Sequence, residues 1–197
     1  MLGRFLSVAV VVAMVGITPT SASTSASHSS APDAVPLNID VGFTHPRLYV
    51  ATDGGEKPAI NVYHQDARFP EPLYQITSGL EYGASQMAMD ASGRLYVADP
   101  DAGVLEYAPH GTSPLRTLDT LGRGLYDASG VALDGAGIIH VVTANGSQGA
   151  GYLLEYHRNA TRPFLVVPGF AGASELALDA AGDTFVIEHP ASGARIV

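Results

Sequence analysis

The chain has 197 residues, 46% of them hydrophobic, and a formal net charge of −9 at pH 7. Nineteen acidic residues stand against ten basic ones, with no basic stripe, which argues against a nucleic-acid partner. The chain has no cysteine, which excludes a disulfide scaffold and a thiolate zinc site, so the fold must be held together by burial alone.

The first 36 residues have the composition of a secretory leader followed by a linker. Arg4 precedes a largely apolar stretch from Phe5 to Ile17, and small residues follow around Ala22, which predicts a signal peptide over residues 1–22. The apolar stretch is shorter than the roughly 20 residues of a membrane helix. We therefore expect a secreted, periplasmic or extracellular protein without stable membrane insertion after cleavage; an uncleaved anchor is the alternative. Residues 23–36 are rich in Ser, Ala and Pro and predict a flexible linker.

Residues 37–197 contain an internal repeat. One phrase occurs as QMAMDASGRLYVAD (86–99), GVALDGAGIIHVVT (130–143) and ELALDAAGDTFVIE (175–188), with a degenerate first copy, LNIDVGFTHPRLYVAT (37–52). Each copy is followed by a tyrosine-containing segment, and in the first three units by one that begins at Pro72, Pro114 or Pro163. Because three segments recur in the same order, we place the units at 37–81, 82–127, 128–172 and 173–197, the last being partial.

Each complete unit is predicted to form four short β-strands. The first two strands are joined by an Asp-x-x-Gly turn at Asp90, Asp134 and Asp179, in which Asp accepts backbone N–H bonds and Gly adopts a positive φ. The following runs, such as residues 95–97, are nearly continuous in apolar character, as in sheets stacked on both faces. Proline begins the fourth strand, an edge position where its missing N–H costs little. The sequence predicts an all-β fold, a β-propeller of four-stranded blades with three complete repeats plus a partial fourth.

The order of an apolar run, D-x-x-G, L-Y-V-A-D and a tyrosine-containing third strand resembles the NHL-type repeat of six-bladed propellers. The units are most similar to exported NHL-like repeat proteins of bacteria, and more distantly to the senescence marker protein/gluconolactonase superfamily. The resemblance spans residues 37–197 and rests on residues that make turns and strands. It implies a β-propeller fold.

The number of units falls short of the ring that this resemblance implies. Six blades at this spacing need about 270 residues, so the chain supplies fewer than four. A truncated product or fragment, a four-bladed ring closed by the N-terminal segment, and partial rings joined by oligomerisation are the alternatives. An open ring predicts self-association through its unpaired blade edges.

Polar residues that break the repeat symmetry are the candidate functional residues. Strand ends and loops around the axis of a propeller often converge on a ligand. We therefore predict ligand contacts at five positions of this kind, which are Gln86, Asp99, Glu175, Glu188 and His189. The aspartates that recur in every copy are assigned to the turns instead.

Two functions remain open on these residues. No G-x-S-x-G elbow, H-E-x-x-H or P-loop is present, so no catalytic residue is predicted, and a binding module for a protein, peptide or carbohydrate is preferred. One alternative is a metal-dependent lactonase-like hydrolase, in which Asp99, Glu175 and Glu188 hold a divalent cation such as calcium. A truncated, non-functional fragment is the other alternative. The resemblance to gluconolactonase-like enzymes implies metal binding by Glu, Asn and Asp from different blades, but no spacing match transfers those roles to this chain.

Overall fold

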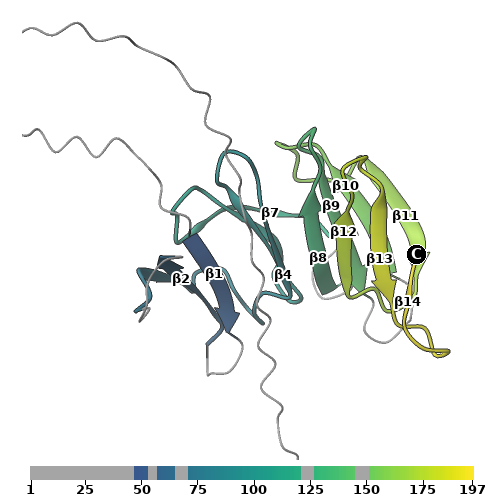
Figure 1. Ribbon diagram of the computed structural model, residues 1–197, viewed down its shortest axis with the longest axis horizontal. Coiled ribbons are helices and arrows are strands. Elements are labelled where there is room, and N and C mark those ends of the chain that lie inside the picture. The colour runs from purple at the N-terminus through teal and green to yellow at the C-terminus, as the bar shows by residue number, and fades with distance from the viewer. Residues whose placement is uncertain (1–46, 53–56, 65–70, 121–126, 145–150) are drawn as a thin grey trace, which may run out of the picture.

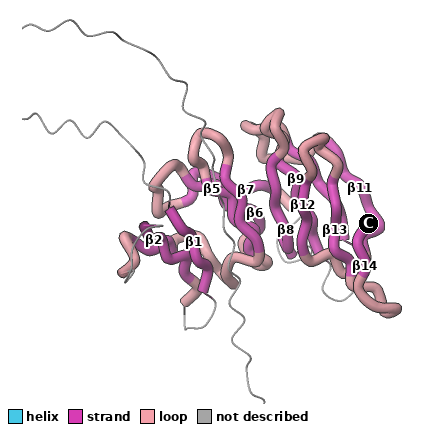
Figure 2. Tube along the Cα trace, viewed as in Figure 1, coloured by secondary structure: helices cyan, strands magenta, loops and turns pink. Residues whose placement is uncertain are grey.

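The computed structural model describes residues 47–52, 57–64, 71–120, 127–144 and 151–197, and the predicted signal peptide and linker lie outside them. All regular structure in these residues is β-strand, as the strands and loops of Figure 2 show. The described part of the chain contains no helix that is long and apolar enough to span a membrane. The prediction of an all-β fold is confirmed.

The strands form four antiparallel sheets, and in the view of Figure 1 the overlapping strands of the last two sheets lie to the right of those of the first two. Sheet 1 consists of β1 (Arg47–Thr52), β2 (Ala59–His64) and β3 (Tyr74–Ile76). Sheet 2 consists of β4 (Gln86–Met89), β5 (Leu95–Asp99), β6 (Gly103–Tyr107) and β7 (Pro114–Leu118). Sheet 3 consists of β8 (Asp127–Leu133), β9 (Ile139–Ala144), β10 (Gly151–Tyr156) and β11 (Leu165–Phe170). Sheet 4 consists of β12 (Glu175–Leu178), β13 (Thr184–Glu188) and β14 (Arg195–Ile196).

One turn type joins the first two strands of sheets 2, 3 and 4, as the sequence predicts. The Oδ1 atom of Asp90 accepts the backbone N–H groups two and four residues further along, at 2.8 and 2.9 Å. The N–H of Gly93 donates to the Asp90 carbonyl at 2.9 Å, and Gly93 has a φ of 82°. Asp134 and Asp179 make the same pair of side-chain bonds. A glycine at positive φ closes such a hairpin without a Cβ clash.

The second strands of sheets 2 and 3, β5 and β9, are buried on both faces, because each of these two sheets lies between two others. Side chains alternate between the faces of a sheet, so a strand of this kind is apolar throughout. All five residues of β5 are buried: Leu95 and Val97 pack toward sheet 1, whereas Tyr96 and Ala98 pack toward sheet 3. We call the side toward the preceding sheet the front face and the side toward the following sheet the back face.

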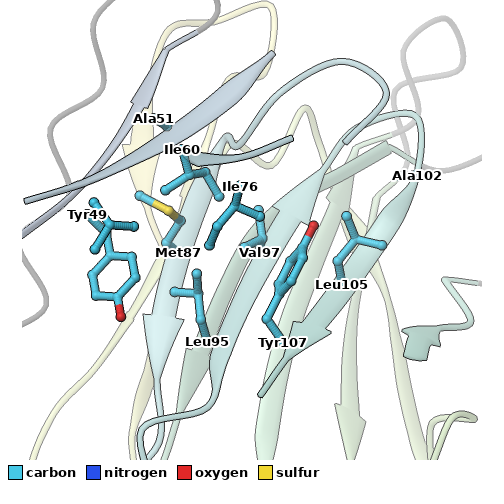
Figure 3. Close-up of a cluster of buried hydrophobic side chains, with 11 residues drawn as sticks. Tyr49, Ala51, Ile60, Ile76, Met87, Leu95, Val97, Ala102, Leu105 and Tyr107 are labelled. Atoms are coloured by element: carbon cyan, nitrogen blue, oxygen red, sulfur yellow. The ribbon is translucent and has the colours of Figure 1, made fainter. Parts of the chain in front are cut away.

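Three apolar cores lie between the four sheets, each formed by one back face and the front face that follows it. The core between sheets 1 and 2 is drawn in Figure 3. Representative members are Tyr49 and Met87 in the first core, Leu118 and Ile139 in the second, and Val142 and Leu176 in the third. Among the described residues, neither the front face of sheet 1 nor the back face of sheet 4 belongs to a core cluster.

The first and last strands form opposite edges of the sheets. The first strands lie side by side, with β8 next to both β4 and β12. The last strands β3, β7 and β11 are the outer edges. Pro114 begins β7, and Pro72 and Pro163 stand two residues before β3 and β11, which confirms that each proline marks an edge strand.

The tyrosines at the ends of the third strands fasten the connections between sheets. The hydroxyl of Tyr107 donates to the carbonyl of Ser78 at 2.8 Å, just after β3. The hydroxyl of Tyr156 donates to the carbonyl of Asp119 at 2.6 Å, just after β7. Burial raises the pKa of both phenols, so each keeps the proton that it donates.

Candidate functional site

Asp99 lies at the end of β5, fully buried, and its carboxylate organises the loop that leads into β4. Its Oδ2 atom accepts the backbone N–H groups of Glu81 and Gly83 at 2.9 and 3.0 Å, and the N–H of Tyr82 reaches both oxygens at 3.2 and 3.3 Å. Its Oδ1 atom accepts two further N–H groups, from residues 101 and 102, at 3.0 and 2.9 Å. Five backbone donors therefore converge on this carboxylate.

The equivalent residue of sheet 4, Glu188, serves the matching loop before β12. It is also buried; its Oε1 atom accepts the N–H of Ala171 at 2.9 Å, and its Oε2 atom accepts the Arg195 Nε–H at 2.7 Å. The hydrogen bond from Arg195, with that of Ala171, lowers the pKa of Glu188 although burial acts to raise it. Asp99 and Glu188 thus hold the segments that enter their own sheets.

Gln86, at the start of β4, connects the first strands of three sheets. Its Nε2 donates to the carbonyl of Leu176 in β12 at 2.8 Å, and its Oε1 accepts the N–H groups of Val131 and Leu176 at 3.2 and 3.3 Å. The side chain passes over Gly130, where a Cβ would lie 2.6 Å from Gln86 Oε1. The symmetry-breaking glycine at the equivalent position of β8 therefore makes room for the glutamine.

The remaining predicted residues, Glu175 and His189, lie in sheet 4 and just after it. Glu175 is exposed, and no hydrogen bond or ion pair within the described residues involves its carboxylate. His189 is also exposed, and its Nε2 is 3.1 Å from the Ser174 hydroxyl. Glu175 pairs with Ile187 across the sheet, so alternation places the Glu175 and Glu188 side chains on opposite faces.

The structure does not gather the predicted carboxylates into one site. In the part of the chain that the structure describes, no three His, Asp or Glu side chains are grouped so that they could hold a metal ion. Asp99 and Glu188 point at different entry loops, and Glu175 points away from Glu188. The residues of the predicted metal site are therefore dispersed.

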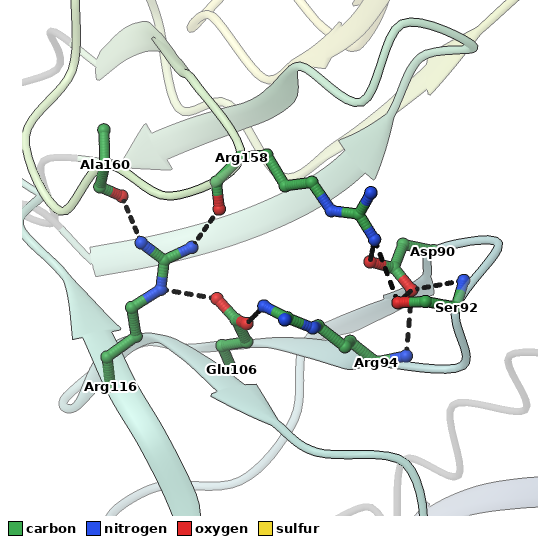
Figure 4. A network of polar contacts seen from close by, with 7 residues as sticks. All are labelled: Asp90, Ser92, Arg94, Glu106, Arg116, Arg158 and Ala160. Atoms are coloured by element: carbon green, nitrogen blue, oxygen red, sulfur yellow. Dashed lines mark hydrogen bonds and ion pairs between the residues drawn. The ribbon is translucent and has the colours of Figure 1, made fainter.

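A charge network centred on the buried Glu106 joins sheet 2 to the turn after β10 of sheet 3 (Figure 4). Glu106, 1% exposed, accepts Arg94 Nη1–H on Oε1 at 2.6 Å and Arg116 Nε–H on Oε2 at 2.5 Å. Arg116 also donates to the carbonyls of Arg158 and, at 2.8 Å, Ala160, in the turn after β10. The repeat pattern gives no sign of this network, because its three charged residues, Arg94, Glu106 and Arg116, occur together only in the second unit.

Arg158 returns from that turn to the Asp90 turn of sheet 2. Its Nη2 lies 2.8 Å from Asp90 Oδ2 and donates to the Ser92 hydroxyl at 2.9 Å. Burial acts to raise the pKa of Asp90, but the hydrogen bonds from Ser92, Arg94 and Arg158 outweigh it, and the pKa is lowered. Asp90 therefore forms an ion pair with Arg158 of sheet 3 and also accepts the backbone N–H groups of its own turn.

His140 occupies in sheet 3 the place that Tyr96 has in sheet 2, and each packs beside the glutamate of the third strand. His140 Nδ1 is 3.6 Å from Glu155 Oε1, and its Nε2 is 3.8 Å from Asp134 Oδ2. The His140 and Tyr96 side chains are both buried. Neither His140 Nε2 nor the Tyr96 hydroxyl has a hydrogen-bond partner within the described residues. Glu155 faces a histidine where Glu106 faces two arginines.

The exposed apolar side chains concentrate toward the C-terminal half of the described chain. Phe164, Leu165 and Val166, at and just before the start of β11, are 49%, 40% and 41% exposed. His157 stacks on the Phe164 ring, with the centroids 4.2 Å apart and the planes 12° from parallel. The outer edge of sheet 3 thus presents three consecutive apolar side chains.

No protein-family model and no curated protein matches the chain. Among solved structures, it is similar to a protein of unknown function from Bacteroides caccae, with a TM-score of 0.59 and 13% identity. The match covers 77% of this chain and 53% of that one.

PorZ of Porphyromonas gingivalis, an essential bacterial surface component of the type-IX secretion system, is also similar in structure. Its TM-score is 0.51 with 14% identity, over 74% of this chain and 22% of PorZ. This chain thus spans about half of the Bacteroides protein and less than a quarter of PorZ. At these identities the likeness concerns the fold alone.

Proposed function

We propose that the chain is an exported β-propeller-type binding module that holds a protein or peptide partner along β11, the outer edge strand of sheet 3. The propeller interpretation is supported by consecutive antiparallel sheets stacked face to face, with their first strands side by side. The resemblance of the repeats to NHL-type units also supports the propeller interpretation. Export is supported by the leader-like first 22 residues.

The observation that carries the proposal is the contrast between the edge strands β7 and β11. Pairing places Arg116 opposite Glu106, and Leu165 at the equivalent position opposite Glu155. In β7, Leu115, Arg116 and Thr117 form the edge, and a charged side chain discourages pairing with a further strand. The same positions at the start of β11 are Phe164, which directly precedes the strand, Leu165 and Val166, all apolar and exposed.

An exposed apolar edge strand offers both unpaired backbone groups and side-chain contacts to an extended peptide. Strand addition of this kind gives affinity through main-chain hydrogen bonds and specificity through alternate side chains. By contrast, Asp99, Glu188 and Gln86 already use their polar atoms within the fold. Binding through β11 therefore fits the structure better than catalysis at the strand ends.

The test is selection of a phage-displayed library of random linear peptides on the purified exported protein. Selected peptides should carry alternating apolar residues and protect the amides of β11 from hydrogen exchange. The double variant Leu165→Arg/Val166→Thr gives β11 the residues of β7 and should weaken peptide binding at least about tenfold, which corresponds to about 1.4 kcal/mol.

The matched control is Tyr82→Ser, which removes a 65% exposed aromatic side chain outside sheet 3. Peptide affinity should be unchanged in this variant. Failure to select any saturable binder, or affinity that the double variant leaves intact, would contradict the proposal.

A further inference from the structure

We propose that the turn between β8 and β9 is a site of covalent self-modification, in which the Asp134–Gly135 peptide bond is converted to an isoaspartyl linkage through a cyclic imide. This inference concerns a turn that is not part of β11 and does not depend on the peptide-binding role. It follows from comparing the three copies of the aspartate turn, which share one hydrogen-bond pattern but differ in the residues around it.

Gly135 supplies the attacking backbone nitrogen with the least steric hindrance that any residue offers. In the other two copies the turn aspartate is followed by an alanine, Ala91 or Ala180. The nitrogen of the following residue closes a five-membered ring on the aspartate Cγ, and a side chain on that residue hinders the closure. Glycine is also free to adopt the main-chain angles that the ring requires. Nothing lies within 4 Å of the place that a Gly135 Cβ would occupy, so no neighbouring atom obstructs it.

The turn places two donors on the oxygen that gains charge in the reaction. Asp134 Oδ1 accepts the backbone N–H groups of Ala136 and Ile138 at 2.9 and 2.7 Å. When the Gly135 nitrogen adds to Cγ, the electron pair of the Cγ–Oδ1 double bond moves onto Oδ1. Donors already fixed on such an oxygen lower the barrier, as in the oxyanion holes of acyl-transfer enzymes. The same two bonds leave Oδ2 as the oxygen that carries the proton of the carboxylic acid.

His140 stands beside Oδ2, which is the leaving oxygen. Its Nε2 lies 3.8 Å from Asp134 Oδ2, is buried and has no hydrogen-bond partner within the described residues. Its Nδ1 lies 3.6 Å from Glu155 Oε1, on the other side of the ring. The equivalent residues of sheets 2 and 4, each paired with an alanine of the first strand as His140 is, are Tyr96 and Phe185. Among the three turns that the structure describes, an imidazole therefore accompanies the Asp134 turn alone.

The reaction is a dehydration followed by a hydrolysis, and it needs no reagent besides water. The Gly135 nitrogen forms a bond to Cγ and releases its proton to solvent. Oδ1 then re-forms its double bond as the Cγ–Oδ2 bond breaks. Oδ2 already carries the acid proton, takes a second proton from His140 Nε2–H and leaves as water, and solvent returns a proton to the imidazole. Water next opens the imide at the main-chain carbonyl of Asp134 and breaks its bond to the Gly135 nitrogen.

The product has the mass of the original protein but one more carbon in its main chain at residue 134. Cγ has become the peptide carbonyl, and the carboxylate is now attached to Cα. The Oδ1 bonds to residues 136 and 138 are lost, so the turn between β8 and β9 is no longer held. Because β8 lies next to both β4 and β12, the modification loosens the strand that sheets 2 and 4 share.

The test is a time course of isoaspartate formation in the purified exported protein, measured by electron-transfer fragmentation of the peptides that contain the three turns. Isoaspartate should accumulate at Asp134 at least about tenfold faster than at Asp90 or Asp179. It should also form faster in the folded protein than in the same protein unfolded in urea, because unfolding removes both the donors of the turn and the imidazole. No isoaspartate at Asp134, or a rate in urea that equals or exceeds the folded rate, would overturn the proposal.

Two variants separate the parts of the site. Gly135→Ala should slow the reaction to the level of the other two turns, and His140→Gln should slow it at least about tenfold by removing the proton donor. Tyr96→Phe removes the hydroxyl at the equivalent place in sheet 2 and is the matched control, with an unchanged rate. A folded His140→Gln protein that reacts at the wild-type rate would refute the site. If that variant does not fold, the comparison of folded with unfolded wild type decides the proposal by itself.

Discussion

The Gln86 side chain lies directly over Gly130, and no side chain larger than hydrogen fits beneath it. A Cβ at Gly130 would meet Gln86 Oε1 at 2.6 Å, Val142 Cγ2 at 2.8 Å and Leu176 N at 3.2 Å. The contact involves all three first strands, since Gln86 bonds to β8 and β12 from β4. Two positions that the repeat leaves variable are thus coupled to each other.

Gly130→Ala should destabilise the protein by about 2 kcal/mol, because the added methyl group displaces the Gln86 amide from its three bonds. Urea unfolding followed by circular dichroism measures the change. In the double variant Gln86→Ala/Gly130→Ala the two losses should be less than additive. The matched control is Gly135→Ala, where nothing lies within 4 Å of the added Cβ; a comparable loss there would show that the effect is general to glycine replacement.

Asp99→Asn should lower the free energy of unfolding by about 3 kcal/mol, since the amide nitrogen faces backbone donors that it cannot satisfy. The loop at residues 81–83 should show faster amide exchange, because three of the five donors lie there. Exchange measured by mass spectrometry reports this locally. Asp101→Asn changes a neighbouring exposed carboxylate and serves as the control; unchanged protection of the loop in Asp99→Asn would contradict the assigned role.

Arg116→Met should be more destabilising than Arg94→Met, although both remove a partner of Glu106. Arg116 also satisfies two carbonyls of the turn in sheet 3, and breaking a buried ion pair costs about 3 kcal/mol. Replacing Glu106 as well, in Glu106→Met/Arg116→Met, should recover part of the loss, because no buried charge is then left unpaired. Thermal unfolding of the three variants decides the order, and equal losses for the two arginine variants would contradict the network of Figure 4.

The depressed pKa values of Asp90 and Glu188 predict a loss of stability in acid. A carboxyl group whose pKa is lower in the folded state stabilises the fold above its ordinary pKa, here 3.8 for Asp and 4.5 for Glu. That contribution is lost as the pH falls through the folded-state pKa. The stability difference between wild type and Asp90→Asn should therefore narrow toward acid pH. Urea midpoints measured from about pH 6 to about pH 3 test this, and a constant difference would contradict it.

The local features of the fold can be read from the sequence because their physical causes are local. The Asp90 turn needs only one aspartate, one glycine and the residues between them, so its three copies identify it. The alternation of Leu95 and Tyr96 between two cores likewise follows from strand geometry. The all-β fold and its division into repeated sheets were therefore predictable.

The roles of the polar residues were not predictable, because they depend on which loop or sheet lies opposite. Asp99 differs in type between copies, which suggested a ligand, but its partners are the N–H groups of a loop that precedes its own sheet. Nothing in the sequence relates Gln86 to Gly130, because their contact forms only when β4, β8 and β12 lie side by side in the fold. The residue type at this position differs between copies because Asp99 and Glu188 bind the loops that lead into their own sheets in different ways.

The hydrogen bonds of Gln86 to sheets 3 and 4 affect the order in which the sheets unfold. In a chain of stacked repeats, each unit usually stabilises only its immediate neighbours, and unfolding can proceed one unit at a time from the ends. Gln86 links sheet 2 to sheet 4 as well as to sheet 3, a contact that skips a unit. Sheets 2 to 4 should consequently melt as a single cooperative block, with sheet 1 free to detach before them.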